Sequence, residues 1–309
     1  MVPRNTFKTK VDISRISLAL GLILLAGCTA PGSRLEPSDW MAWKALRLES
    51  VAGTNGWTTL IGLHWLNEGE NSAGSSPTND VVLRSNHFPP NLGTFLRRGA
   101  SVSFASAPEA HVQEAGRAVT KLNLISDPSP HPTQLEIGPV SIIVIDRGER
   151  IGLRVRDEKS EARRNFKGLR SFPYDPAWRL AGRFIPYSQP RTLQVPDVTG
   201  SFQKFESPGE ITFSVRGSEC RLAIAIEPEV RDFFIMFRDE TAGATTYPAG
   251  RFLYVQKPVS GDDVIIDLNR AYTPPCGFTE FATCPLPPRQ NHFPFNIEAG
   301  ELKPVGTHH

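Results

Sequence analysis

Short apolar runs separated by turn residues make up most of the chain from residue 57 to residue 268. Each run is bounded by Gly, Pro, Asn or Asp, and this spacing is typical of strands in an antiparallel sandwich or barrel. The pattern therefore predicts a mainly β fold, an antiparallel β-sandwich or barrel-like domain with a short N-terminal helix and one short internal helix. The predicted strands cover residues 57–66, 81–83, 102–104, 118–125, 139–146, 151–155, 178–187, 192–195, 211–215, 221–227, 233–237, 247–256 and 264–268.

Apolar residues recur at helical spacing directly after Ser38 and Asp39, either of which can cap a helix. The residues of this stripe are Trp40, Trp43, Leu46 or Arg47, and Val51. We expect the stripe to face the domain; the alternative is that Trp40 and Trp43 stack on a carbohydrate. A second helix is predicted at residues 160–167, after a β-hairpin that turns at residues 147–149.

The first residues have the pattern of an export signal rather than of a folded element. Basic residues precede an apolar run at residues 16–27, which is too short to span a bilayer as a mature helix. The run ends in Leu25-Ala26-Gly27-Cys28, which resembles the bacterial lipobox, where a signal peptidase cuts before a cysteine that is acylated. The alternative is an ordinary cleaved signal with an incidental Cys28. We expect residues 1–27 to be a lipoprotein signal peptide.

The residues after Cys28 predict the location of the protein and the organisation of its domain. Residues 28–37 form a tether rich in Pro, Gly and Ser, and residues 38–309 form a single β-rich domain whose two subdomains meet near residues 187–196. Thr29 stands where an aspartate would retain a lipoprotein in the inner membrane. The lipid on Cys28 should therefore anchor the protein in the outer membrane of a Gram-negative cell envelope, facing the periplasm.

Charge is nearly balanced, with 34 Lys and Arg against 32 Asp and Glu, so no nucleic-acid partner is expected. Basic residues are nevertheless concentrated in and after the predicted hairpin. They are Arg150, Arg154, Arg156, Arg163, Arg164, Lys167, Arg170, Arg179 and Arg183. Two interpretations stay open: an anion-binding surface near a sheet edge, or solvated strand faces that carry ordinary ion pairs.

The most unusual stretch is the loop at residues 267–288, which contains many prolines and two of the four cysteines. Prolines fix φ and remove backbone donors, so this loop should be rigid, and rigid loops rich in side chains often carry function. Cys276 and Cys284 lie eight residues apart and could close a disulfide in an oxidising compartment. Cys220 is expected to be a buried apolar residue in a strand.

Candidate ligand-binding residues lie on this loop and on the hairpin before it. They are Asp239, Tyr247 and Arg251 on the hairpin, and Asp267, Asn269 and Tyr272 on the loop. Their chemistry suits either a clamp for a small molecule or envelope component, or a buried structural network. Asp267 and Asn269 offer too few oxygen ligands for calcium, and the loop cysteines with His292 lack zinc spacing. No metal and no cofactor are therefore predicted.

Two other classes of function stay open beside ligand binding. The first is a hydrolase, with His64, Asp239, Cys276 or Cys284 in the chemistry, although no complete catalytic motif is present. His64 lies between apolar neighbours in a predicted strand, where a half-buried histidine without catalytic role is the alternative. The second class is a structural or assembly lipoprotein whose ordered loop forms a protein interface.

Four stretches resemble the domain of unknown function 1684 family of bacterial and archaeal proteins. They are residues 62–66, residues 147–157, residues 246–252 and the loop at residues 267–288, and the resemblance runs from about Trp43 to Glu301. Thr273 and His292 depart from the asparagine and arginine typical of those positions. The resemblance implies a single β-rich domain without an established activity. Members without a secretion signal keep both loop cysteines, which counts against a disulfide there.

Residues 74–83 also resemble the opening of a forkhead-associated domain. The phosphothreonine-binding arginine of that family is missing, because Ser75 stands at its position, and no Ser-Arg-x-x-His sequence follows. The resemblance therefore implies a similar shape and no phosphopeptide binding.

Overall fold

The computed structural model describes residues 37–228 and 230–305, which belong to one compact unit, Glu36–His309. The predicted signal peptide, Cys28 and the tether up to residue 36 lie outside the described residues. In the described part of the chain, no helix is both long and apolar enough to cross a bilayer. Antiparallel strands dominate, so the prediction of a mainly β fold with an N-terminal helix is confirmed.

Helix α1 (Ser38–Ala52) buries Trp40, Arg47 and Val51, as its apolar spacing predicts. The indole Nε1 of Trp40 donates to the backbone oxygen of Asn269 at 3.1 Å, which fixes the start of the helix to the other end of the chain. The N-cap residue is Pro37, and no side chain caps the helix. The expected cap by Ser38 or Asp39 is therefore wrong, because both residues already lie within the helical turn.

The first β region is a sandwich of two sheets that share one apolar core, which includes Leu83, Phe95, Phe104, Leu135 and Ile142. Its six-stranded sheet has the order β1 (Leu60–Trp65), β11 (Arg150–Asp157), β10 (Val140–Arg147), β9 (Gln134–Ile137), β6 (Gln113–Glu114) and β7 (Arg117–Ala118). Its five-stranded sheet has the order β3 (Val81–Val82), β2 (Gly69–Gly74), β4 (Gly93–Arg98), β5 (Ser101–Ser106) and β8 (Lys121–Leu124). Only the short β2–β3 pair is parallel among the described strand pairs.

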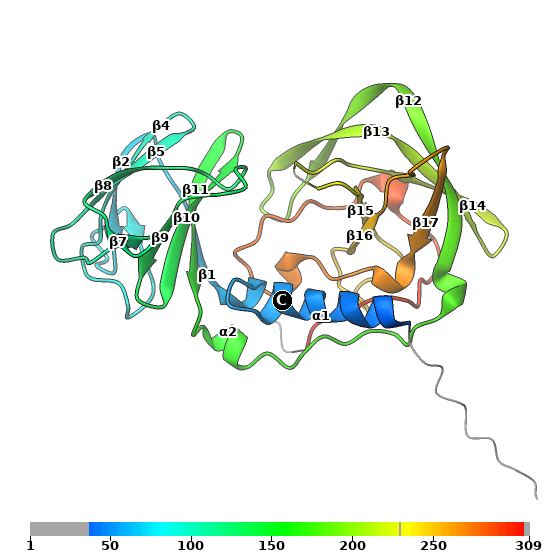
Figure 1. The fold of residues 1–309 in the computed structure, drawn as a ribbon, viewed down its shortest axis with the longest axis horizontal. Coiled ribbons are helices and arrows are strands. Elements are labelled where there is room, and N and C mark those ends of the chain that lie inside the picture. The colour runs from blue at the N-terminus through cyan, green and yellow to red at the C-terminus, as the bar shows by residue number, and fades with distance from the viewer. Residues whose placement is uncertain (1–36, 229, 306–309) are drawn as a thin grey trace, which may run out of the picture. The chain divides into compact units, whose positions relative to one another are not determined.

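The second β region is a curled sheet that bends around a two-stranded hairpin (Figure 1). The sheet has the order β14 (Ser218–Ala223), β13 (Phe202–Val215), β12 (Arg179–Pro196) and β17 (Asp263–Asp267), and the hairpin consists of β15 (Phe233–Phe237) and β16 (Arg251–Val255). Glycine permits the close approach of β12 and β13, since a Cβ on Gly209 would lie 2.3 Å from the backbone oxygen of Ile185. Phe237 and Leu253 are buried in the core between sheet and hairpin.

The predicted meeting point of the two subdomains, residues 187–196, lies within the long strand β12, whose register with β13 shifts between Pro186 and Arg191. The chain leaves the sandwich at residues 158–178, through α2 (Glu161–Arg164) and the 3-10 turn η2 (Pro176–Trp178). Residues 57–59 are also a 3-10 turn, η1 (Trp57–Thr59), rather than the start of a strand.

The C-terminal part of the chain, residues 268–302, is irregular backbone with three 3-10 turns: η3 (Leu268–Arg270), η4 (Pro275–Gly277) and η5 (Arg289–Asn291). Asn291, which is fully buried, holds the last of these turns against two strands. Its Nδ2 donates to the backbone oxygens of Ala223 and Met236 at 2.9 and 2.7 Å, and its Oδ1 accepts from the Ala223 N–H at 2.7 Å.

We expect Asn291→Ala to lower the free energy of unfolding by about 3 kcal/mol, because it leaves three buried backbone groups without partners. Urea denaturation followed by circular dichroism measures the change. His292→Ala is the matched control, since His292 is the exposed neighbour of Asn291 and should change the midpoint little. Equal midpoints for the two variants would show that the C-terminal segment is not held in this way.

Candidate functional site

A cleft of about 1360 Å³ lies in the described part of the chain and is here called the central cleft. Its wall includes residues of α1, the tip of the β10–β11 hairpin, the β12–β13 strands with the β15–β16 hairpin, the loop at residues 272–285, and residues 127–130, 227, 228 and 230. It therefore joins elements from both β regions with the N-terminal helix. Apolar and aromatic side chains and several arginines line it.

Arg147 connects the hairpin to the loop at the arginine-lined end of the central cleft. Its guanidinium makes two hydrogen bonds to the carboxylate of Asp127, at 2.9 and 2.7 Å. Its Nε donates to the Oγ1 of Thr283 at 3.2 Å. Both oxygens of Asp127 are thus taken up by one guanidinium in a bidentate pair.

Arg154 lies beside this pair with few partners. Its side chain is 7% exposed, its Nη1 is 3.8 Å from the nearer oxygen of Asp127, and its Nε has no hydrogen-bond partner. Burial, and then the nearby charge of Arg147, lower the pKa of Arg154 to about 10, while Asp127 acts in the opposite direction. Arg154 is therefore a buried cation at neutral pH whose contacts are a long one to a shared carboxylate and one to the Trp57 ring, 5.6 Å from its centroid.

Aromatic rings also line the central cleft. Tyr272 stacks on Tyr254, with ring centroids 6.1 Å apart and planes inclined by 22°, and the guanidinium of Arg47 lies 4.6 Å from the Tyr272 ring. The hydroxyl of Tyr254 donates to the carboxylate of Glu227. Burial raises the pKa of Tyr272 and of Tyr254, so both rings keep neutral hydroxyls at physiological pH.

Cys276 and Cys284 lie next to each other as thiols, and the N–H of Cys276 donates to the Sγ of Cys284 at 3.1 Å. The hydroxyl of Tyr247 donates to the backbone oxygen of Cys276 at 3.0 Å. The hydrogen bond with Cys284 lowers the pKa of Cys276, whereas burial raises the pKa of Cys284, which lines the central cleft. Their pairing as a disulfide stays a prediction.

Asp239 and Arg251 form a buried ion pair of 3.0 Å, in which the side chains are 1% and 0% exposed. Arg251 also donates to the backbone oxygens of Ala299 and Ile297, and Asp239 accepts from the N–H of Ile297 at 2.8 Å. Of the two interpretations left open by the sequence, the structure supports the buried network. These residues hold the C-terminal segment in place, and neither lines the central cleft.

Asp267 and Asn269 are likewise engaged with the protein itself. Asp267 accepts from the backbone N–H and the Nδ2 of Asn269, and Asn269 makes two hydrogen bonds to the backbone of Asp175, at 3.0 and 2.9 Å. Among the six residues predicted to bind a ligand, only Tyr272 lines the central cleft. In the described ranges, no group of three or more His, Cys, Asp or Glu is placed to hold a metal ion.

His64 lies away from the loop cysteines. On β1 it pairs with Leu153, whereas its neighbour Leu63 pairs with Arg154. Successive side chains of a strand point to opposite faces, so His64 and Arg154 project to opposite faces of the sheet. His64 is half-buried, and burial followed by the charge of Arg84 lowers its pKa.

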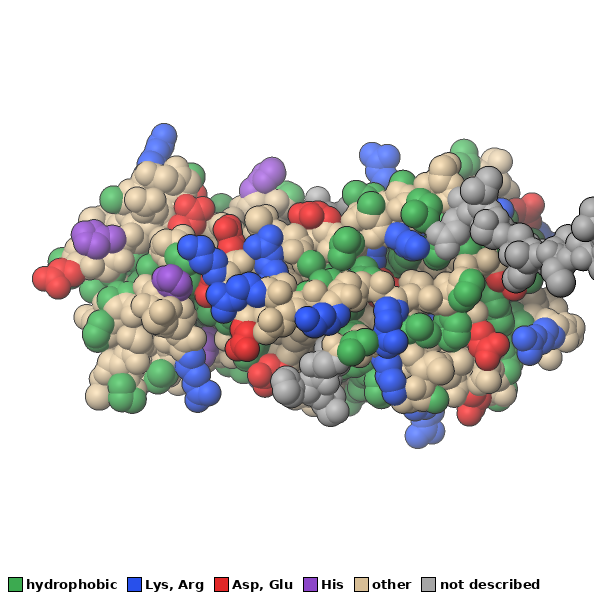
Figure 2. All heavy atoms as spheres, turned by 90° about the horizontal axis from the view of Figure 1, so that it is seen from below, with side chains coloured by type: hydrophobic (Ala, Val, Ile, Leu, Met, Phe, Trp, Pro, Cys, Tyr) green, Lys and Arg blue, Asp and Glu red, His purple; other side chains and the backbone are tan. Residues whose placement is uncertain are grey.

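Several basic residues of the cluster in and after the β10–β11 hairpin form contacts within the fold. Arg156 and Arg163 donate to backbone oxygens of residues 52–56 and 158, and Arg150 stacks on Trp65 at 3.8 Å and donates to Ser201. The face that carries α1 and α2 shows basic and acidic side chains intermixed, without a single-sign surface (Figure 2). Arg154 is the member of the cluster that is buried without a complete set of partners.

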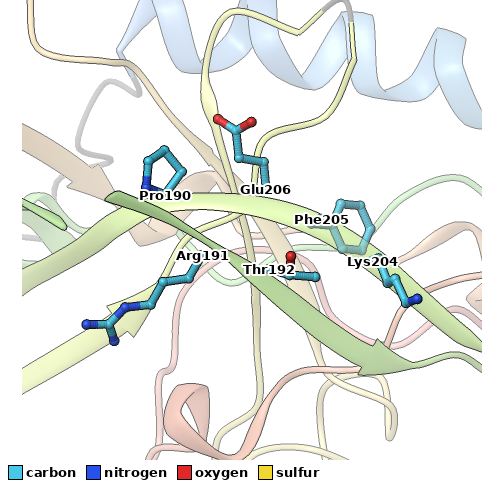
Figure 3. A pocket seen from close by; sticks show the side chains of 6 residues that line it. All are labelled: Pro190, Arg191, Thr192, Lys204, Phe205 and Glu206. Atoms are coloured by element: carbon cyan, nitrogen blue, oxygen red, sulfur yellow. The ribbon is translucent and has the colours of Figure 1, made fainter. Parts of the chain in front are cut away.

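A second hollow, of about 350 Å³, lies on β12 and β13. Its wall consists of Pro190, Arg191, Thr192, Lys204, Phe205 and Glu206, most of them exposed. Arg191 and Lys204 point away from Glu206, so the charged groups do not converge on one point (Figure 3). This hollow therefore offers less to a ligand than the central cleft.

Sequence reasoning missed Asp127, Arg147, Glu227 and Tyr254 as wall residues. One sequence signal was available for Arg154: it is a charged residue inside the run Ile151–Val155, whose other members are apolar or glycine. A charge in such a run is either paired or functional. No comparable pattern marks Asp127, which lies in a turn-rich segment far from its partner in the chain.

Comparison with known proteins supports the family resemblance. A family model described as "Protein of unknown function (DUF1684)" matches residues 164–302, so the resemblance is confirmed there. A solution NMR structure of an uncharacterised protein from Haloarcula marismortui is 26% identical over 47% of this chain and 81% of its own, with a TM-score of 0.40. A crystal structure of the FhaA FHA domain is 13% identical over 30% of this chain and 97% of its own, with a TM-score of 0.21. No curated protein matches.

We expect Asp239→Ala to lower the free energy of unfolding by about 3 to 5 kcal/mol, because it leaves the guanidinium of Arg251 buried without its counterion. Chemical denaturation with urea measures the loss. Arg221→Ala is the control, since Arg221 forms its ion pairs on the exposed surface and should have little effect. A folded Asp239→Ala protein of unchanged stability would rule out the structural role assigned to this pair.

Proposed function

We propose, for a chain whose residues 164–302 belong to the DUF1684 family, that the central cleft binds a small organic ligand. The observation that carries the proposal is the composition of the cleft wall, in which the stacked rings of Tyr254 and Tyr272 line the same hollow of about 1360 Å³ as several arginines. Ligand sites are concave and mostly apolar, with a few polar groups that fix orientation.

The wall is well suited to hold a ligand because its side chains are already fixed by the protein. Tyr272 is held between Tyr254, Phe252 and the guanidinium of Arg47, so its ring needs little rearrangement on binding. Arg47 is itself fixed by hydrogen bonds to Glu301 and to the backbone oxygen of Thr273. Preorganised aromatic groups of this kind reduce the entropy that is lost on binding.

A hydrolase is less well supported. Cys284 is the one candidate nucleophile that lines the central cleft, and burial raises its pKa, which favours the thiol over the nucleophilic thiolate. His64 projects to the sheet face opposite Arg154, and Asp239 is committed to Arg251. The residues that line the central cleft are therefore better suited to binding a ligand than to catalysis.

The location that we propose is the cell envelope, with the lipid on Cys28 anchoring the protein in the outer membrane. The lipobox-like sequence supports it, and α1, the first helix that the structure describes, begins at Ser38, directly after the expected tether. A ligand of the central cleft would then be a small molecule or an envelope component that reaches the periplasm.

We expect Tyr272→Ala to weaken the binding of a neutral aromatic probe roughly tenfold, since the variant removes a stacked ring from the cleft wall. The probe is N-phenyl-1-naphthylamine, whose fluorescence rises in apolar sites, titrated into the purified mature protein. Thr192→Ala, in the smaller hollow on β12, is the control and should bind the probe as the wild type does. If wild type shows no saturable binding, or if Tyr272→Ala binds equally well, the central cleft does not bind a neutral aromatic ligand through Tyr272.

We expect Cys28→Ser to move the protein from the membrane fraction to the soluble fraction and to abolish labelling by radioactive palmitate, because acylation requires the thiol. Detergent phase separation of cells that express each form measures the first change. A wild-type protein that is soluble and unlabelled would exclude the lipoprotein assignment while leaving the central cleft unaffected.

A further inference from the structure

We propose that Arg154 forms an anion-binding subsite in the central cleft, which recognises a carboxylate or phosphate group on the ligand. The inference rests on the proposed ligand-binding function and specifies its chemistry. The ligand would combine this anionic group with an apolar or aromatic part that contacts the tyrosine wall.

Arg154 lies in the middle of β11, between the buried Leu153 and Val155, and pairs with Ile143 on β10 and with Leu63 on β1. Because side chains alternate along a strand, Arg154 projects to the sheet face opposite that of Leu153 and Val155. On that face it is buried and lines the central cleft. A charged group is costly there unless a partner satisfies it.

The protein itself supplies an incomplete set of partners for the guanidinium of Arg154. Asp127 is the nearest carboxylate, yet Arg147 holds both of its oxygens, and the N–H of Asp146 takes one of them as well, at 3.0 Å. Two guanidiniums therefore share a single carboxylate. Arg154 receives the longer contact, 3.8 Å, which is beyond hydrogen-bond distance.

The other acidic groups at this end of the cleft do not neutralise Arg154. The carboxylate of Asp146 accepts from the N–H of Gly148 at 2.8 Å and lies within the hairpin turn. Glu149, the remaining acidic residue of the hairpin tip, is exposed. Neither of these two described residues forms a salt bridge with Arg154, whose nearest carboxylate is that of Asp127.

The available donors fit a planar or tetrahedral oxyanion. A guanidinium has five N–H donors in a rigid fork that matches two oxygens of a carboxylate or phosphate. The Nε of Arg154 is itself buried without a hydrogen-bond partner, so a ligand in the cleft would meet the terminal part of the guanidinium. Thr283 lines the same cleft and accepts from Arg147, which leaves its hydroxyl hydrogen as a further donor. Even with its pKa lowered to about 10, Arg154 stays protonated at pH 7.

The test compares ligands that differ only in charge. Benzoate and phenyl phosphate carry the two candidate anionic groups, and benzamide is the neutral analogue of benzoate. Each is used to displace N-phenyl-1-naphthylamine from the wild type, from Arg154→Met and from Arg154→Lys. Arg221→Met is the matched control, since it removes the same charge from an exposed position outside the cleft.

We expect the wild type to bind at least one of the two anions roughly tenfold more tightly than benzamide, a difference of about 1.4 kcal/mol. The ratio should fall to about one in Arg154→Met and stay unchanged in Arg221→Met. Arg154→Lys keeps the charge without the fork and should give an intermediate ratio. A preference for benzoate indicates a carboxylate ligand, and a preference for phenyl phosphate indicates a phosphate.

Equal displacement by benzamide and both anions in the wild type would overturn the proposal, as would an unchanged ratio in a folded Arg154→Met protein. If Arg154→Met does not fold, the wild-type ratio and Arg154→Lys decide the question. The neutral probe separates the two proposals. Saturable probe binding without anion preference refutes only the subsite.

For a protein that does not bind the probe, thermal melting in phosphate is compared with melting in chloride of equal ionic strength. Stabilisation by phosphate that Arg154→Met abolishes would then support the subsite, and its absence would refute both proposals.

Discussion

Backbone groups that are buried outside helices and sheets need hydrogen-bond partners, and residues 268–302 obtain many of theirs from side chains. Arg251 donates to the carbonyl oxygens of Ala299 and Ile297, and Arg47 donates to that of Thr273. The side chain of Asn291 likewise forms hydrogen bonds with backbone groups of Ala223 and Met236 in two strands. The irregular segment can be buried only because these side chains are in place, and the shape of the central cleft follows from it.

The two most deeply buried arginines of the β regions show how partners separate structural from functional positions. Arg251 has a carboxylate at 3.0 Å and two backbone acceptors, so its charge is used within the fold. Arg154 is nearly as buried but has one shared carboxylate at 3.8 Å. Both residues are buried arginines, and they differ in the acceptors that surround each guanidinium. For this reason we assign a structural role to Arg251 and a role in ligand recognition to Arg154.

Most of the fold could be predicted from local pattern, because alternation and turn residues act over a few positions. Residues 233–237 are a strand as expected, and the strand expected at residues 264–268 runs from Asp263 to Asp267. Helix α1 buries the side that its apolar spacing indicates. Residues 187–196 have a turn-like sequence and lie within β12, whose register with β13 shifts there. Local pattern does not distinguish a strand that bends from one that ends.

The candidate site was harder to predict, because it depends on which distant groups meet. Tyr272, a candidate because of the unusual composition of its loop, lines the central cleft. Asp239 and Arg251 have the chemistry of a ligand clamp, and only their contact with residues 297–299, more than forty positions away, shows that they are structural. Asp127 and Arg147 carried no local indication of their pairing.

The contacts of α1 also determine at what stage of synthesis the chain can complete its fold. Trp40 binds Asn269, and Arg47 binds Thr273 and Glu301, across separations of 226 to 254 residues. Contacts between such distant positions form slowly, since a long segment of chain must first be brought together. The first helix to leave the ribosome has no docking surface until nearly the last residues have followed. A chain truncated shortly before Glu301 would therefore fail at its beginning as well as at its end.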